Sequence, residues 1–239
     1  MHILRSTKIK KHIISLLETI RLLTKINIWK TLYFNFHYFP YNIAKQFPVY
    51  IYRRSVFYLL KGNISIIAPI RPGMIRLGSH LLGTQDPLYP RTILEISGNI
   101  VFHGKAIFGR GCKITVGKDA TLTVGKNFVS TGNTHVICQK EIKFGDNCLL
   151  SWDILMMDTD FHHILNEQGI VLNNPKPILI GNDVWIGCRN TILKGVTIPD
   201  NNVISANSTI THSFIEENCI IGGHRKYAEV IKRNIRWEN

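Results

Sequence analysis

The first 61 residues contain almost no acidic side chains. They hold 11 lysines and arginines but a single acidic residue, Glu18, whereas residues 62–239 hold 18 basic and 15 acidic residues. The net charge of +13 therefore belongs mainly to this N-terminal arm. A basic arm favours an anionic surface as partner. We expect no nucleic-acid partner, because the nearly neutral body lacks a basic groove and the aromatic residues of the arm form one block.

Several other features are missing, and each absence excludes a class of protein. The five cysteines include no C-x-x-C pair and are odd in number, which excludes a disulfide framework and fits a reducing compartment. No early segment combines a basic flank, an apolar run and a small-residue cleavage site, so we expect no signal peptide. No window approaches 18 uninterrupted apolar residues, which excludes a membrane-spanning helix. We therefore expect a cytoplasmic protein.

The arm itself combines apolar periodicity with aromatic residues. Apolar residues from Ile9 to Ile26 recur at helical spacing, an aromatic block runs from Trp29 to Phe39, and a second apolar stretch covers residues 47–60. This pattern predicts an α-helical arm over residues 1–61. Two interpretations stay open: the arm lies on an anionic membrane, at the inner face of the bilayer, or it packs on the rest of the protein.

Six isoleucines recur at intervals of six residues in the C-terminal half: Ile180, Ile186, Ile192, Ile198, Ile204 and Ile210. The same phase continues upstream at Phe144, Leu150 and Met156. A period of six belongs to neither a helix nor an ordinary strand and indicates a parallel β-helix, in which each unit is a short strand plus a corner. The aliphatic residue of each unit should point inward, so that stacked coils bury one apolar column.

The segment Ile180-Gly-Asn-Asp-Val-Trp-Ile-Gly187, followed by Ile192-Leu-Lys-Gly-Val-Thr-Ile198, resembles the hexapeptide-repeat acyltransferases. Within that superfamily it is most similar to galactoside/maltose-type and surface-polysaccharide O-acetyltransferases. The resemblance implies a mainly β protein with a left-handed parallel β-helix. The expected order is the helical arm, a connecting segment, the β-helix with one protruding loop and a C-terminal segment, over residues 1–61, 62–91, 92–223 (loop 157–179) and 224–239.

The strict period breaks between residues 157 and 179, which predicts a loop expelled from the solenoid; such loops are usually functional. The loop contains two adjacent histidines, His162 and His163. Members of the superfamily carry their catalytic histidine at the start of such a loop, and their usual spacing back from Trp185 falls one residue before His162. We therefore assign the general base to His162, with His163 as the alternative.

Imidazole suits this task because it titrates near neutral pH and can take the proton of a sugar hydroxyl as that hydroxyl attacks a thioester. A carboxylate should hold the imidazole in one tautomer, and Asp160 or Asp153 is the candidate. A backbone N–H near Gly187 or Cys188 should stabilise the tetrahedral oxyanion.

The resemblance implies acetyl-CoA as co-substrate and no metal ion. It places Trp185 at the border of the active site, although packing against a neighbouring subunit also explains so large a residue there. Residues matched to the pantetheine groove are Ala206, Thr211 and His212, and the cations near the chain end that could hold CoA phosphates are Arg225, Lys226, Lys232 and Arg233.

The stretch from Ser130 to His135 aligns with a segment that contacts the acceptor sugar in the superfamily. Asn133 and His135 are therefore expected acceptor contacts, together with Asp153. Gln139 stands where the superfamily has an acidic residue, which implies an acceptor specificity different from that of galactoside enzymes.

The resemblance thus implies an acetyl-CoA-dependent O-acetyltransferase that modifies a sugar hydroxyl of a surface or capsular polysaccharide or of its precursor. Serine or the amine of a nucleotide sugar would be alternative acceptors for the same machinery. Because the CoA site of similar enzymes lies between two subunits, we expect a homotrimer with closed symmetry.

Two hypotheses of other classes remain. A zinc hydratase resembling the γ-type carbonic anhydrases needs three imidazoles that converge across a subunit boundary; His103, His135, His162 and His163 are present without the ordered spacing of that family. A purely structural β-helix is the other hypothesis, and the histidine-bearing loop argues against it.

Overall fold

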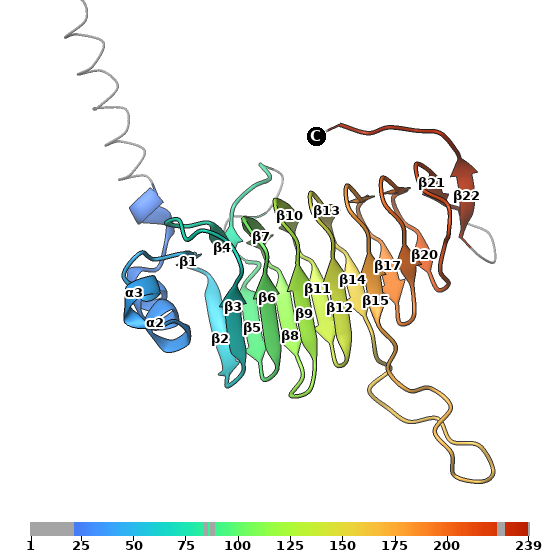
Figure 1. Ribbon diagram of the computed structural model, residues 1–239, viewed down its shortest axis with the longest axis horizontal. Coiled ribbons are helices and arrows are strands. Elements are labelled where there is room, and N and C mark those ends of the chain that lie inside the picture. Colours follow the sequence, from blue (N-terminus) through green and yellow to red (C-terminus); the bar gives the residue numbers. More distant parts are fainter. Residues whose placement is uncertain (1–21, 84–85, 87–88, 224–227, 239) are drawn as a thin grey trace, which may run out of the picture.

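Short parallel strands stack into three sheets that form the sides of a prism (Figure 1). The computed structural model describes residues 22–83, 86, 89–223 and 228–238. Sheet I contains β1 (Val49–Ile51), β4 (Ile75–Ser79), β7 (Ala106–Arg110), β10 (Phe128–Gly132), β13 (Leu149–Trp152), β16 (Trp185–Ile186), β19 (Val203–Ile204), β21 (Ile220–Gly222) and the antiparallel β22 (Glu229–Lys232). Sheet II contains β2 (Ser55–Leu60), β5 (Thr92–Ile96), β8 (Lys113–Val116), β11 (His135–Cys138), β14 (Leu155–Met157), β17 (Thr191–Leu193) and β20 (Thr209–Ile210). Sheet III contains β3 (Asn63–Ile66), β6 (Asn99–Phe102), β9 (Thr121–Val124), β12 (Glu141–Phe144), β15 (Ile178–Ile180) and β18 (Thr197–Ile198).

The chain visits the sheets in the order I, II, III and then returns to sheet I one coil further on. Three rows of turns therefore run along the prism, and we call them corner I–II, corner II–III and corner III–I. Each coil buries one apolar residue per side, as the period of six predicts. Ile180 pairs with Ile198 in sheet III, Ile186 with Ile204 in sheet I, and all four are buried. The predicted apolar column is confirmed.

The β-helix begins earlier in the chain than the sequence predicts. Residues 49–66, expected as the end of a helical arm and the start of a connecting segment, form β1, β2 and β3 instead. These strands pair in parallel with β4, β5 and β6, so they belong to the same three sheets. The parallel sheets therefore start at Val49 rather than at residue 92. The six-residue period is hidden here because the first coils carry longer excursions between their strands.

Helix α2 (Ile28–Tyr38) covers the N-terminal end of the prism, followed by the short helix α3 (Tyr41–Ala44) (Figure 1). The Asn27 side chain caps α2 by accepting a hydrogen bond from the Lys30 backbone N–H at 2.9 Å, which satisfies one of the unpaired donors of a helix start. The Asn35 side chain bonds both the carbonyl and the N–H of Val49 in β1. This part of the arm thus packs on the β-helix, as one of the two interpretations predicts. The helix expected over residues 9–26 lies mostly outside the described residues.

Two described segments of the C-terminal half leave the regular prism. Residues 158–177 form a protruding loop between β14 and β15, at corner II–III (Figure 1), and a bridge between Leu165 and Val171 closes it into a narrow hairpin. This confirms the predicted loop. After β22 the C-terminal residues cross sheet I, where the Trp237 ring packs at 6.1 Å from the Trp185 ring. Among the described residues, no helix is long and apolar enough to cross a bilayer.

Candidate active site

The protruding loop is anchored by a buried carboxylate. The side chain of Asp158 is fully buried at the exit of β14. Its two oxygens accept hydrogen bonds from the backbone N–H groups of Gln139, Lys140 and Glu141 at 2.7, 2.8 and 2.8 Å. Bonds to an ionised acceptor are among the strongest in proteins. Asp158 therefore fixes the first residue of the loop against the preceding coil.

A second set of contacts closes the base of the loop. The Asp160 carboxylate forms an ion pair with Lys194 and accepts a bond from the Asn173 amide at 2.7 Å. The Asn173 amide also donates to the His162 carbonyl oxygen at 2.8 Å, and Lys194 donates to the Asn173 carbonyl at 2.8 Å. The bonds from Lys194 and Asn173 lower the pKa of the Asp160 carboxyl. The two ends of the loop are thus tied together directly beside His162.

The predicted base is exposed at this point. The His162 and His163 side chains both face solvent, and neither imidazole forms a hydrogen bond or ion pair within the described residues. The expected carboxylate partner is not in place: Asp160 binds Lys194 and Asn173 instead, because these groups satisfy its oxygens. Asp153, the other candidate partner, lies at corner I–II. Each imidazole is therefore free to meet groups from outside the chain.

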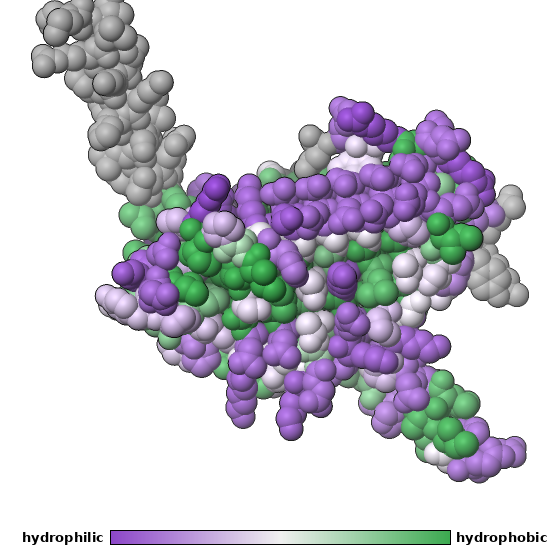
Figure 2. All heavy atoms as spheres, viewed as in Figure 1, coloured by the Kyte–Doolittle hydropathy of each residue, from purple (hydrophilic) through white to green (hydrophobic). Residues whose placement is uncertain are grey.

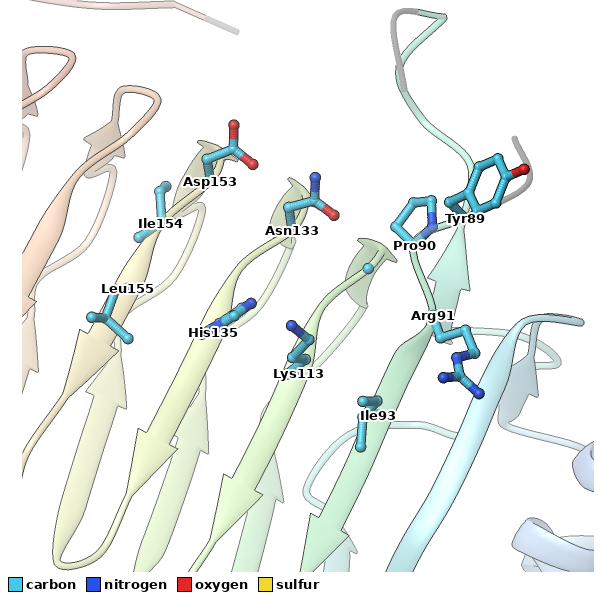
Figure 3. Close-up of a pocket in the computed structure, with 11 residues that line it drawn as sticks. Tyr89, Pro90, Arg91, Ile93, Lys113, Asn133, His135, Asp153, Ile154 and Leu155 are labelled. Carbon is cyan, nitrogen blue, oxygen red and sulfur yellow. The ribbon is translucent and has the colours of Figure 1, made fainter. Parts of the chain in front are cut away.

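A groove of about 630 Å³ lies along corner I–II and the adjoining outer face of sheet II, and we call it the corner groove. Three side chains paired across neighbouring strands of sheet II, Lys113, His135 and Leu155, form its floor (Figure 3). The other residues that line it are Tyr89, Pro90, Arg91, Ile93, Gly111, Asn133, Asp153 and Ile154. A second hollow of about 690 Å³ shares Tyr89, Pro90, Asn133 and Asp153 with it and adds Leu82, Asp86 and Trp152.

The corner groove unites three of the four predicted acceptor contacts. Asn133 and Asp153 occupy equivalent turns of successive coils, with φ of 49° and 57°, and both side chains project from the corner on the same side (Figure 3). Burial, and then the charge of Lys113, lowers the pKa of the half-buried His135, while Asp153 raises it. Gln139 is not part of this group. It lies at corner II–III, where its side chain packs beside Gly117.

The predicted CoA residues fall on different corners. Gly187 and Ala206 are neighbours at corner I–II, where a Cβ on Gly187 would lie 2.9 Å from the Ala206 backbone nitrogen. Thr211 and His212 lie beyond β20 at corner II–III, and the His212 ring packs at 4.8 Å from Phe214.

The two candidate oxyanion donors also differ. The Gly187 N–H already donates to the Ile204 carbonyl at 2.8 Å, whereas no backbone partner is found for the Cys188 N–H in the part of the chain that the structure describes. This leaves Cys188 as the available donor of the two.

The predicted cations near the chain end contribute unequally. Lys232 is exposed on β22, while Arg233 is paired with Glu216 through two hydrogen bonds. Arg225 and Lys226 lie outside the described residues. Trp185 sits on sheet I with its Nε1 donating to Ser151 Oγ at 3.1 Å. Because corner II–III is the edge of the prism opposite sheet I, one chain does not bring His162 and Trp185 together.

The residues of these sites that the sequence did not single out include Tyr89, Arg91, Lys113, Asn173 and Lys194. Arg91 and Tyr89 precede the expected start of the β-helix, and Lys113 resembles any exposed strand lysine. Lys194 pairs with the loop because Met157 is in register with Leu193. This register could be predicted only by recognising that residues 158–177 are an insertion within one coil, so that β14 still stacks on β17. Among the described residues, no group of three His, Cys, Asp or Glu side chains is placed to hold a metal ion.

Comparison with known proteins agrees with this architecture. Residues 177–212 match the family model described as bacterial transferase hexapeptide (six repeats). This stretch of the chain is thus identified as hexapeptide repeats. It is 35% identical over 106 residues to galactoside O-acetyltransferase of Escherichia coli K12, covering 44% of this chain and 51% of that protein. It is 32% identical over 106 residues to polysialic acid O-acetyltransferase of Neisseria meningitidis, covering 43% and 49%. The chain therefore spans about half the length of these relatives.

A solved structure supports the fold. The crystal structure of a polySia-specific acetyltransferase superposes with a TM-score of 0.51 at 22% identity, over 77% of this chain and 72% of that one. The expected left-handed parallel β-helix is thereby confirmed, and so is the resemblance to galactoside and surface-polysaccharide O-acetyltransferases.

Proposed function

We propose that the protein is an acetyl-CoA-dependent O-acetyltransferase that modifies a sugar hydroxyl of a surface or capsular polysaccharide or of its precursor. One observation carries the proposal: a long loop leaves the prism of hexapeptide coils at corner II–III, and from a base fixed by Asp158 and Lys194 it presents His162, whose imidazole has no hydrogen-bond partner among the described residues. The galactoside and polysialic acid O-acetyltransferases among its relatives support acetyl transfer to sugars.

The residues suggest how the reaction would proceed. The His162 imidazole takes the proton of the acceptor hydroxyl while the hydroxyl oxygen attacks the thioester carbonyl carbon. Because Cys188 lies at corner I–II and His162 at corner II–III, the Cys188 N–H that donates to the resulting oxyanion comes from a second copy of the chain. When the carbon–sulfur bond breaks, the imidazolium returns its proton to the departing thiolate, so that the imidazole ends as it began. Gly187 and Ala206 are small residues on neighbouring coils beside Cys188, which suits the slender pantetheine arm.

We propose that the active enzyme is a homotrimer, because one chain leaves the site incomplete. His162 lies at corner II–III, opposite the sheet that carries Trp185, and a second copy can bring the two together. The loop also exposes four apolar side chains that a neighbouring copy could cover: Ile164, Leu165, Ile170 and Leu172; Figure 2 shows this apolar band behind a hydrophilic tip. Light scattering should give three chains per particle, and a stable monomer at micromolar concentration would contradict the proposal.

The test of the function is acetyl-CoA turnover by the full chain against nucleotide sugars, lipid-linked sugars, polysaccharides, serine and amino sugars. Thiol release together with an ester on a sugar oxygen supports the proposal. An amide product, or transfer to serine, would support the alternative acceptors instead. Absence of turnover with every acceptor, in a preparation that binds CoA, would contradict an acetyltransferase.

We also propose that the protein is cytoplasmic and contacts the inner face of the membrane through the outer face of α2. Its five free thiols fit a reducing compartment.

The outer face of α2 presents three aromatic residues at helical spacing: Trp29, Tyr33 and Phe36, which are 81%, 55% and 46% exposed. Phe34, on the opposite face, is buried against the prism. Tyr33 also lies 6.2 Å from the ring of Phe57 in β2. No acidic residue occurs between Glu18 and Asp86. Aromatic residues ringed by cations are typical of interfacial helices.

Replacing both Trp29 and Phe36 by serine should weaken binding to anionic vesicles on the order of 30- to 1,000-fold, because each buried aromatic ring contributes about 1–2 kcal/mol. Co-sedimentation with phosphatidylglycerol vesicles measures this, and added salt should weaken binding further. Tyr89→Ser is the matched control, since Tyr89 is as exposed as Trp29 but lies in the corner groove. Equal binding by the double variant and the control would exclude this surface.

A further inference from the structure

The corner groove holds two cationic side chains that have no anionic partner in the described part of the chain. The Arg91 guanidinium and the Lys113 ammonium line the groove, and Lys113 lies beside His135 on its floor (Figure 3). Within the residues that the structure describes, neither cation takes part in a salt bridge or a side-chain hydrogen bond. Among the described residues that line the groove, only Asp153 carries a carboxylate, and Asp86 lines the adjoining hollow.

The charge of the groove is therefore positive at neutral pH. The lowered pKa of His135, which follows from its burial and from Lys113, leaves its imidazole neutral there. Two cations then face one carboxylate. Asp153 also stands apart from them, because it projects from corner I–II with Asn133, while Lys113 lies on the face of sheet II (Figure 3). The groove thus has two cations, Lys113 on its floor and Arg91 on its lining, and a rim of hydroxyl-binding groups.

This division matches a ligand with two chemically different parts. An amide and a carboxylate on one rim can bond sugar hydroxyls, and the exposed rings of Tyr89 and Trp152 can pack against the apolar face of a sugar. A guanidinium binds carboxylate or phosphate oxygens bidentately, and an ammonium adds a second charge-assisted bond. The volume of about 630 Å³ is within the range of small-molecule sites.

We propose that the corner groove binds an acceptor sugar that carries a negative charge, with Arg91 and Lys113 on the anionic group and Asn133 and Asp153 on the hydroxyls. The inference rests on the proposed function, because the groove and the histidine loop occupy the two ends of the same outer face of sheet II. The anionic group is a carboxylate if the acceptor is an acidic sugar of a polymer, and a phosphate if it is a sugar phosphate of a precursor.

Binding by the full chain without acetyl-CoA tests the proposal separately from activity. The probes are methyl β-glucuronide, glucose 1-phosphate and the neutral methyl β-glucoside, titrated by ligand-observed NMR. We expect at least one anionic probe to bind about tenfold or more tightly than the neutral one, since a charge-assisted bond contributes about 1.5–3 kcal/mol. The tighter of the two anionic probes identifies the source of the negative charge.

Arg91→Gln and Lys113→Gln should each reduce this preference at least threefold, whereas Lys118→Gln, an exposed lysine at corner II–III, should leave it unchanged. Saturating CoA should not displace the anionic probe. Equal binding of neutral and anionic probes, no binding of any probe, or displacement by CoA would each overturn the proposal. If anionic probes bind as expected and no acceptor is ever acetylated, the proposed function fails while the binding site stands.

Discussion

His162→Ala should lower the rate of acetyl transfer by roughly 10²- to 10⁴-fold, the usual contribution of a general base, while CoA binding persists. The expected loss is large because a sugar hydroxyl is a weak nucleophile until a base removes its proton. His162 occupies the point where the loop leaves the prism, and its main chain is fixed there by Asn173. Steady-state kinetics with the best acceptor, together with CoA affinity, measure the two effects separately.

His163→Ala is the internal control and should be milder, since both imidazoles are exposed on the same segment and only one should face the acceptor. If His163→Ala proves to be the inactive variant, the register of the loop is off by one residue. His135→Ala provides a second comparison. It lies in the corner groove, so it should change the KM for the acceptor more than kcat; a loss in kcat comparable to that of His162→Ala would move the base to the groove.

Asp158→Ala should lower the free energy of unfolding by about 3–4 kcal/mol, because it removes the charged acceptor of three backbone N–H groups at once. The three bonds act on one tight turn, so their losses should not add fully. Denaturant unfolding at a fixed protein concentration measures the effect, since assembly would make stability depend on concentration. The same variant should also reduce activity, because the loop loses its anchor to the preceding coil.

Asp160→Ala is the matched control for this prediction. Its carboxylate lies two residues further along and forms an ion pair, but it is exposed, so its removal should cost less than about 1 kcal/mol. Asp158→Asn should fall between the two, because an amide oxygen still accepts hydrogen bonds without the negative charge. Equal destabilisation by Asp158→Ala and Asp160→Ala would show that burial of the first carboxylate is not what matters.

The contrast between these aspartates shows how far the candidate site could be read from the sequence. The sequence does not distinguish the three aspartates near the two histidines, which are Asp153, Asp158 and Asp160. It predicted that either Asp153 or Asp160 orients His162. In the structure one lines the corner groove, one is a buried anchor and one pairs with Lys194. The roles differ because each carboxylate belongs to a different corner or depth of the prism, and burial decides which groups can reach it.

The sequence by itself determined the repeat and its interruption. A six-residue period is a local property of the sequence, because each inward isoleucine is followed by a corner and another inward residue. The apolar column over residues 180–210 and the loop of residues 158–177 therefore follow from the chain alone.

Only the tertiary structure decided where the β-helix begins and which residues of successive coils contact one another. Val49 stacks on Ile75 and Ile75 on Ala106, at intervals longer than the regular coil of Ile180 and Ile198, so no fixed period reveals them. The corner groove and the Asp160–Lys194 pair arise in the same way, because the residues that stack depend on the length of every excursion between them.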